Sequence, residues 1–394
     1  MQAEMATEIL QSDFSYVISA PTGSGKTVIF ELAICKFLPA IELATGKTRP
    51  ISLYLAPLKS LCSERMTEWH DKLKTLGYTC LELTSDSPHY ETEELMQHTV
   101  LIATPEKIDS LLRFQEGMKD LVARVTLLMV DEIHTIADQS RGACLEAVIM
   151  RFFASHPRIL AATATCPNIS DIAQWLSTPD RPCLCRSFGS QFRPVPITKI
   201  VLGYRKSPQS SLFQFDQFLT KKLLPLIRTY SQGRPTLIFS ITRKTAENTA
   251  EWLARGGILC SNIRQELVDS ISGGLLKECL SKGVGFHHAG VSPVDRRLVE
   301  EAFVDGCIPV LVSTSTLSMG INLPAHLVII KNTALYVEGS TQEYTTRQML
   351  QMIGRAGRPQ FSTSATAVIM TTSAKKEYYE HWLEDAESVE SRSS

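Results

Sequence analysis

Short apolar runs alternate with amphipathic helical patterns along most of this sequence, and that alternation leaves few folds open. In the first half, five runs are predicted to be buried strands, at residues 16–19, 51–56, 100–104, 125–131 and 158–162. Between them, Leu58, Leu61, Trp69, Leu73 and Leu76 keep helical spacing. Strands that alternate with helices form parallel sheets. The sequence therefore predicts an α/β fold with a mostly parallel sheet flanked by helices.

A proline-rich segment interrupts this rhythm once. Residues 179–196 carry four prolines and three arginines with little periodicity, which favours a crossing between two lobes. Six further runs then predict strands at 197–202, 236–239, 284–287, 310–313, 327–331 and 367–370. After Lys376 the chain turns acidic and rich in serine. We expect a first lobe at 1–185, a linker at 186–196, a second lobe at 197–378 and a tail at 379–394.

Composition narrows the class of protein. A chain of 394 residues suits two or three domains of roughly 150 residues each. Residues 1–15 lack the order of a signal peptide, and no apolar stretch approaches the 18 or so residues that span a bilayer, so we expect no membrane partner. Ten cysteines without a Cys-x-x-Cys pair disfavour zinc ribbons and disulfide frameworks and suit a reduced compartment. The net charge of −1 means that nucleic-acid binding would need local patches.

The strongest local motif is Ala-Pro-Thr-Gly-Ser-Gly-Lys-Thr at residues 20–27, directly after the first predicted strand. It matches the phosphate-loop pattern except that Ala20 replaces the first glycine. Two glycines allow the backbone to wrap around phosphates, Lys26 is placed to reach the β- and γ-phosphates, and Thr27 to ligate Mg²⁺. The alternative is a plain glycine-rich turn, which the near-complete pattern disfavours. The expected cradle is Ala20, Pro21, Thr22, Gly23, Ser24, Gly25, Lys26 and Thr27.

A second motif supplies the carboxylates that such a loop needs. Asp131-Glu132-Ile133-His134 follows an apolar strand. Asp131 is expected to hold the metal, and Glu132 to polarise the attacking water. Alone, two acidic residues after a strand would more simply be a solvated helix cap. The preceding phosphate loop favours the catalytic reading.

This combination resembles the DExH helicases of superfamily 2, and the resemblance covers residues 1 to about 378. The family's other motifs follow in order: Pro-Leu-Lys-Ser-Leu at 57–61, Thr-Ser-Asp at 84–86, Thr-Pro-Glu-Lys at 104–107, Thr-Ala-Thr at 163–165, the strand end at 237–240, His-His-Ala-Gly at 287–290, the run at 314–324 and Gln-Met-Ile-Gly-Arg-Ala-Gly-Arg at 351–358. Thr-Ser-Asp departs from the usual Thr-Gly-Asp.

Within that superfamily the sequence is most similar to the superkiller-like branch. Arg-Gly-x-x-Leu-Glu at 141–146 and Leu-Pro-Ala-His at 323–326 indicate the branch. Residues 314–319, followed by Ile-Ile-Lys-Asn-Thr at 329–333, look most like the HFM-type meiotic crossover DNA helicases. Spliceosomal and transcription-coactivator relatives share most of these motifs.

The resemblance implies two RecA-like lobes with ATP and Mg²⁺ between them and single-stranded or branched DNA across their tops. It implies a monomer that moves 3′ to 5′ and serves meiotic recombination in the nucleus, with winged-helix and ratchet domains after the second lobe. Gln2 is expected to read adenine, and Gly320 and Asn322 to line the nucleotide. Arg355 and Arg358, one turn apart, would stabilise the charge on the departing phosphate, with Gln351 holding the attacking water.

Contact with nucleic acid is expected at loops that open helices, because helix N-termini and hydroxyls bind phosphates without a large positive charge. Such contacts read no bases, so binding should be independent of sequence and sensitive to salt. The expected contact residues are Pro57, Lys59, Ser60, Thr104, Pro105, Ser240, Arg243 and Thr314.

A hairpin is predicted at residues 335–345, with Gly339 and Ser340 at its turn. By resemblance it would be the wedge that parts a duplex; the alternative is a plain surface hairpin. His287 and His288 are interpreted as a structural pair at a strand end, since no further ligand stands at metal-binding spacing.

Two other functions stay open: an RNA helicase or ribonucleoprotein-remodelling ATPase of the same branch, and a truncated isoform that binds partners or strands without unwinding.

Overall fold

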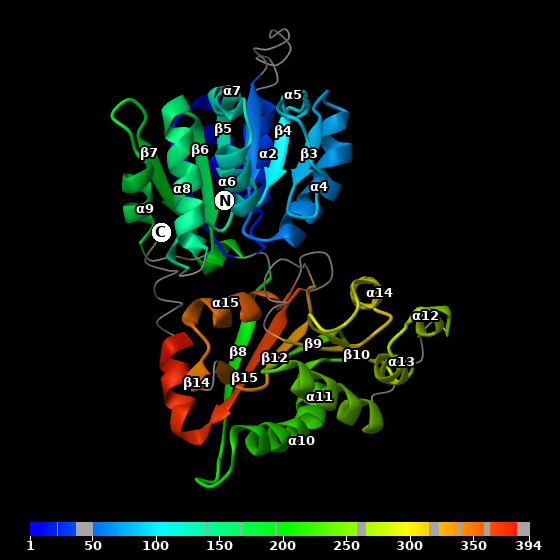
Figure 1. Cartoon of the computed structure of the whole chain (residues 1–394). Helices are drawn as coiled ribbons and strands as arrows, with labels where there is room; N and C mark the ends of the chain where they lie inside the picture. Colours follow the sequence, from blue (N-terminus) through cyan, green and yellow to red (C-terminus); the bar gives the residue numbers. More distant parts are fainter. Residues whose placement is uncertain are drawn as a thin grey trace. The chain divides into compact units, whose positions relative to one another are not determined.

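The chain folds into two compact units, which divide between Arg193 and Pro194 (Figure 1). The computed structural model describes residues 1–21, 23–36, 50–138, 141–164, 168–193, 195–257, 265–314, 323–337, 340–357 and 363–383. Each unit is built on its own parallel sheet, as the alternating pattern predicts. The predicted fold class is confirmed.

The first unit contains a seven-stranded sheet in the order β3-β4-β2-β5-β6-β1-β7, in which every neighbouring pair is parallel. Its strands are β1 (Ser15–Ser19), β2 (Ile51–Leu55), β3 (Cys80–Leu83), β4 (Val100–Ala103), β5 (Val125–Val130), β6 (Arg158–Thr163) and β7 (Cys183–Ser187). Its helices are α1 (Gln2–Gln11), α2 (Lys26–Lys36), α4 (Lys59–Lys74), α5 (Thr92–Leu95), α6 (Pro105–Phe114), α7 (Met118–Arg124), η2 (Ile133–Ala137), α8 (Gly142–Phe152), η3 (Phe153–Ser155), α9 (Ile169–Leu176) and η4 (Ser190–Phe192).

Helices cover both faces of this sheet, which explains why its inner strands are mostly apolar and buried at nearly every position. Successive side chains of β1 enter different cores: Val17 packs with α5 to α9, whereas Tyr16 and Ile18 pack with α1, α2 and α4. Trp69 of α4 is fully buried in the second of these cores, as its helical spacing predicts.

The sequence did not predict two strands of this sheet. The short β3 and the edge strand β7 carry polar residues, because edge strands bury less of each face. β7 lies inside the segment read as a crossing, and Phe188 and Phe192 continue the first unit's core beyond it, with their ring centroids 5.1 Å apart. The expected linker at 186–196 is therefore wrong over most of its length.

The second unit contains a six-stranded parallel sheet in the order β10-β11-β9-β12-β15-β8. Its strands are β8 (Ile197–Tyr204), β9 (Thr236–Ser240), β10 (Val284–His287), β11 (Val310–Thr314), β12 (Leu327–Ile330) and β15 (Ala365–Thr372). Its helices are α10 (Leu212–Tyr230), α11 (Arg243–Arg255), α12 (Gln265–Ser270), α13 (Gly274–Leu280), α14 (Pro293–Val304), α15 (Thr346–Gly354) and η6 (Ser373–Lys375).

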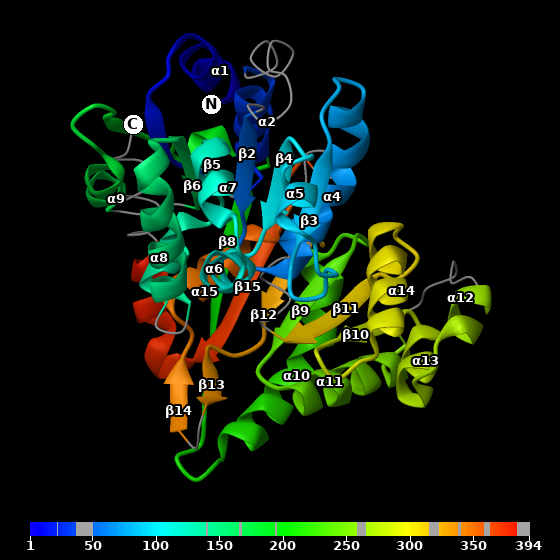
Figure 2. The same ribbon diagram turned by 45° about the horizontal axis from the view of Figure 1, so that its top comes forward.

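The predicted hairpin exists. Strands β13 (Ala334–Val337) and β14 (Ser340–Glu343) pair in antiparallel fashion and form a ribbon separate from the large sheet (Figure 2). Ser340, predicted at the turn, is instead the first residue of β14, and Gly339 lies outside the described residues.

The expected tail begins too early. Residues 376–383 are helical, and Tyr379 and Leu383 are buried in the second unit's core, because their spacing places both on one face of that helix. Among the described residues, no helix has the length and apolarity that crossing a membrane requires.

Candidate functional site

The phosphate loop lies at the carboxyl edge of the first sheet, between the end of β1 at Ser19 and the start of α2 at Lys26. Ligands of open α/β sheets bind at this edge. Gly23 and Gly25 adopt left-handed φ values of +81° and +86°, which side chains rarely tolerate. A Cβ at Gly25 would also overlap the amide of Gln2. Thr22 lies outside the described residues.

Lys26 folds back over this loop. Its ammonium group donates to the carbonyl oxygens of Ala20 at 2.7 Å and Pro21 at 3.2 Å. Burial lowers the pKa of Lys26, and the carboxylates of Glu132 and Asp131 act against that shift. The charge of Lys26 is thus already placed where the loop would hold phosphates.

Ser24 and Gln2 complete the described part of the cradle. The Ser24 hydroxyl is buried and makes no hydrogen bond among the described residues. It is therefore a donor with its capacity free for a phosphate oxygen. Gln2, from α1, donates through Nε2 to the Gly25 carbonyl oxygen at 3.5 Å, a long contact that holds it against the loop. These features suit a nucleoside triphosphate.

The two carboxylates follow β5, the strand next to β2. The Asp131 amide donates to the Leu55 carbonyl at 2.9 Å, which extends the ladder to the end of both strands. Burial and the Glu132 charge raise the pKa of Asp131, whereas a hydrogen bond from Tyr54 and the charge of Lys26 lower it. Glu132 has a φ of +52°, an uncommon backbone conformation for a residue with a side chain and one that occurs at functional turns.

His134, the last residue of the Asp-Glu-Ile-His motif, contacts a residue of the Thr-Ala-Thr motif. His134 Nδ1 lies 2.5 Å from the hydroxyl of Thr163 and 3.2 Å from Glu132 Oε2. Thr163 ends β6 and begins the Thr-Ala-Thr motif, whose third residue lies outside the described part of the chain. The sequence does not predict this contact, because the two residues are 29 positions apart and no pattern links them.

In the second unit the predicted residues do not share one helix. Helix α15 contains Gln351 and ends at Gly354, with Arg355 at its C-cap. Gly357 has a φ of +83°, and a Cβ there would lie 2.6 Å from Val195, so the helix does not continue through Gly357. Arg358, Gly320 and Asn322 lie outside the described residues. Whether Arg355 and Arg358 lie one turn apart therefore stays a prediction.

The residues predicted to contact nucleic acid differ in exposure. Thr104, Pro105, Ser240 and Thr314 are buried at strand ends or at the first turn of a helix. Lys59 and Arg243 are exposed at the first residues of α4 and α11, and Pro57 and Ser60 are half-buried. Lys59 already pairs with Asp86 at 2.7 Å, within the Thr-Ser-Asp motif.

Arg141 joins two of these loops and was not predicted to do so. Its guanidinium donates to the Pro57 carbonyl oxygen at 2.9 Å and lies 3.9 Å from Glu106, next to Pro105. A Cβ at the neighbouring Gly142 would overlap the Ile136 carbonyl of η2, so only glycine allows this close approach. The Arg-Gly pair noted in the sequence thus connects the Asp-Glu box with both loops.

The two histidines at the end of β10 each face a carboxylate. His287 Nε2 lies 2.6 Å from Glu300 of α14, and His288 Nε2 lies 3.3 Å from Glu247 of α11. Burial lowers the pKa of His288. Among the described residues, no three side chains group as metal ligands.

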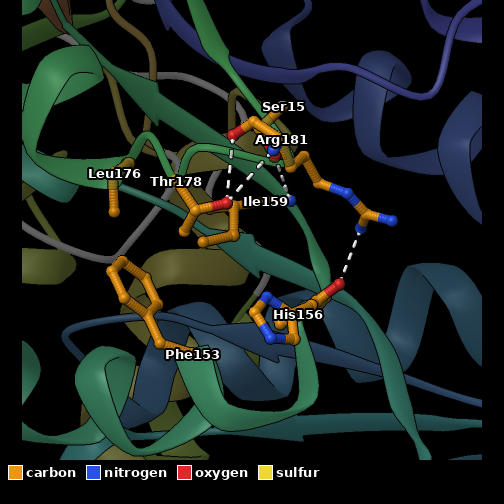
Figure 3. A pocket seen from close by; sticks show the side chains of 8 residues that line it. Ser15, Phe153, His156, Ile159, Leu176, Thr178 and Arg181 are labelled. Carbon is orange, nitrogen blue, oxygen red and sulfur yellow. Dashed lines mark hydrogen bonds between the residues drawn. The ribbon is translucent and has the colours of Figure 1, made fainter.

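A small hollow at the opposite edge of the first sheet has no part in this site. It is lined by Ser15, Phe153, His156 and Arg181, and Arg181 donates to the His156 carbonyl at 2.8 Å (Figure 3). Its volume of about 10 Å³ admits at most a single water.

The geometry of the first unit, a phosphate loop beside an Asp-Glu box at the carboxyl edge of a parallel sheet, is that of a nucleotide hydrolase. Residues 1–172 match the family model described as DEAD/DEAH box helicase, and residues 219–360 match the helicase conserved C-terminal domain. The chain therefore contains the two conserved domains of a helicase, and the predicted resemblance is confirmed.

Individual proteins similar to this chain indicate which helicases it resembles. The Xenopus tropicalis protein named probable ATP-dependent DNA helicase HFM1 is 42% identical over 99% of this chain and 30% of its own length. ATP-dependent DNA helicase MER3 of Saccharomyces cerevisiae is 42% identical over 99% of this chain and 33% of its own. Activating signal cointegrator 1 complex subunit 3 of Bos taurus is 35% identical over 99% of this chain and 18% of its own. The chain thus spans a third or less of these relatives.

Proposed function

We propose that this chain is the ATP-hydrolysing motor core of a 3′-to-5′ DNA helicase that acts on recombination intermediates in meiosis. The observation that carries the proposal is the placement of Lys26 and of Asp131 with Glu132 around one phosphate loop. The names of the HFM1 and MER3 relatives, which call them ATP-dependent DNA helicases, support DNA as the track. A role in meiotic recombination would place the chain in the nucleus. A monomer acting on single-stranded or branched DNA suits this reading.

In this proposal the residues of the first unit divide the work. Lys26 and the amides that open α2 bind the phosphates, and Gln2 reads the adenine. Thr27 and Asp131 would hold Mg²⁺, which when bound neutralises charge on the phosphates. Glu132 orients the attacking water. Through its 2.5 Å contact with the Thr163 hydroxyl, His134 couples the position of the Asp-Glu box to that of the Thr-Ala-Thr motif.

The deciding experiment measures phosphate release from saturating ATP and Mg²⁺, without nucleic acid, with single-stranded DNA and with RNA of equal length. We expect DNA to stimulate release more than RNA does. Greater stimulation by RNA would instead favour the remodelling ATPases of the same branch. No release under any condition would reject the motor and favour a chain that only binds.

A substitution in the second half of the chain tests which residue stabilises the negative charge that develops on the departing phosphate. Arg358→Ala should abolish hydrolysis while ATP affinity stays within roughly tenfold of the parent, because such an arginine acts on transition-state charge more than on ground-state binding. Single-turnover hydrolysis and nucleotide titration measure the two effects. A collapse of both together would make Arg358 a binding or folding residue.

The hairpin tests strand separation. Replacing residues 336–341 by a Gly-Ser link keeps Glu343, which accepts from the Tyr379 hydroxyl at 2.5 Å, and the buried Tyr344. We expect DNA-stimulated ATPase to persist and unwinding of a forked duplex to fall, measured in a form that carries the family's winged-helix and ratchet domains. Unwinding at the parent's rate would leave the hairpin as a structural element.

A further inference from the structure

A buried tyrosine holds the metal-site carboxylate of the Asp-Glu box. Tyr54 lies on β2, next to β5, and has no exposed surface. Its hydroxyl donates to Asp131 Oδ2 at 2.7 Å, across 77 residues of sequence. Tyr54 belongs to none of the sequence motifs. An aromatic residue in a buried strand normally serves packing alone, so the sequence gives no reason to assign Tyr54 a further role.

Both carboxylate oxygens of Asp131 are engaged. While Tyr54 donates to Oδ2, the backbone amide of Glu132 donates to Oδ1 at 2.9 Å. The two donors approach from a neighbouring strand and from the following residue, so together they fix the rotation of the carboxylate. Each oxygen retains a further lone pair for a ligand.

Tyr54 is itself held rigidly. Its ring makes edge contacts with Phe30 of α2 at a centroid distance of 5.6 Å and with Trp69 of α4 at 5.1 Å. Nearby Arg65 is buried and pairs with Glu68 at 2.6 Å and Glu64 at 2.9 Å. A phenol carries its proton near neutral pH and a carboxylate can only accept, so Tyr54 is the donor of the 2.7 Å contact with Asp131.

We propose that Tyr54 is a positioning residue that orients Asp131 for the divalent cation of the nucleotide site. The inference rests on the proposed ATP-hydrolysing function. Hydrogen bonds from outer residues to metal-binding carboxylates commonly contribute tenfold to a hundredfold in metal affinity. Because α2 carries both Lys26 and Phe30, the same tyrosine also ties the position of Asp131 to the helix that opens at the phosphate loop.

The test replaces Tyr54 by phenylalanine, which keeps the ring contacts and removes only the donor. The matched control is Tyr78→Phe: Tyr78 is buried in the same core, and its hydroxyl donates to the Ile34 carbonyl at 2.9 Å, away from the box. A fluorescent ADP analogue is titrated in EDTA and at rising MgCl₂, and steady-state phosphate release is measured over the same Mg²⁺ range.

For Tyr54→Phe we expect nucleotide affinity in EDTA to stay within about twofold of the parent and the Mg²⁺ concentration for half-maximal effect to rise about tenfold. Turnover should recover at high Mg²⁺, because the metal ligand itself remains. Tyr78→Phe should behave as the parent in both assays. In an Asp131→Asn background, Tyr54→Phe should cause no further loss of Mg²⁺ response.

Equal Mg²⁺ responses of Tyr54→Phe and Tyr78→Phe would overturn the inference while leaving the proposed function intact. Loss of nucleotide binding by Tyr54→Phe in EDTA as well would also overturn it, since that pattern marks a purely structural residue. A parent chain whose nucleotide binding ignores Mg²⁺ would instead reject the proposed metal site, and the role of Tyr54 with it.

Discussion

Lys26→Ala should lower ATP turnover by at least ~100-fold, because the loop then loses the charge that meets the β- and γ-phosphates. In the structure the ammonium group already lies against the loop carbonyls of Ala20 and Pro21. Replacing it by a methyl group leaves the backbone amides in place but removes the stabilisation of charge that develops as the phosphate departs. The measurement is phosphate release with saturating single-stranded DNA.

Helix α2 offers a matched control. Lys36, ten positions along the same helix, pairs with Asp13 at 2.6 Å and donates to the Ser12 carbonyl, away from the loop. Lys36→Ala should keep turnover near that of the parent. Turnover of Lys26→Ala within about twofold of the parent would contradict the assignment of the phosphate loop.

Lys331→Met should destabilise the second unit by about 3–5 kcal/mol, because it leaves a buried carboxylate without its counter-ion. Lys331 directly follows β12, is fully buried, and donates to Asp216 at 2.7 Å, Thr220 at 2.9 Å and Thr249 at 2.7 Å. These partners come from α10 and α11, so one ammonium group joins two helices to the sheet.

Urea unfolding of the chain, followed by hydrogen exchange of peptides from α10 and α11, measures this loss. The control Lys244→Met removes the exposed ion pair with Glu247 on α11 and should cost less than about 1 kcal/mol. Adding Asp216→Leu to Lys331→Met should restore part of the stability, since it removes the uncompensated charge. If the single variant is as stable as the control, the buried pair is not the anchor of these helices.

Features that depend on neighbours in the chain were predictable from the sequence. The apolar runs became strands, and the glycines of the phosphate loop occupy left-handed conformations, as their positions suggest. Asp131 and Glu132 were placed beside the loop because strands that end in a parallel sheet share one edge. Local residue patterns decide such features, since backbone conformation and strand burial are read over a few positions.

Features that depend on which strands and helices become neighbours were decided only by the tertiary structure. The edge position of β7 carried the first unit past its predicted end, and α15 ended at Gly354, which leaves Arg355 at its C-cap. Tyr54 and Lys331 looked like ordinary members of apolar strands until Asp131 and Asp216 were brought to within 2.7 Å of them. A polar group in an apolar run becomes meaningful only through its partner, and sheet order and helix packing choose that partner across 77 and 115 residues of chain, respectively.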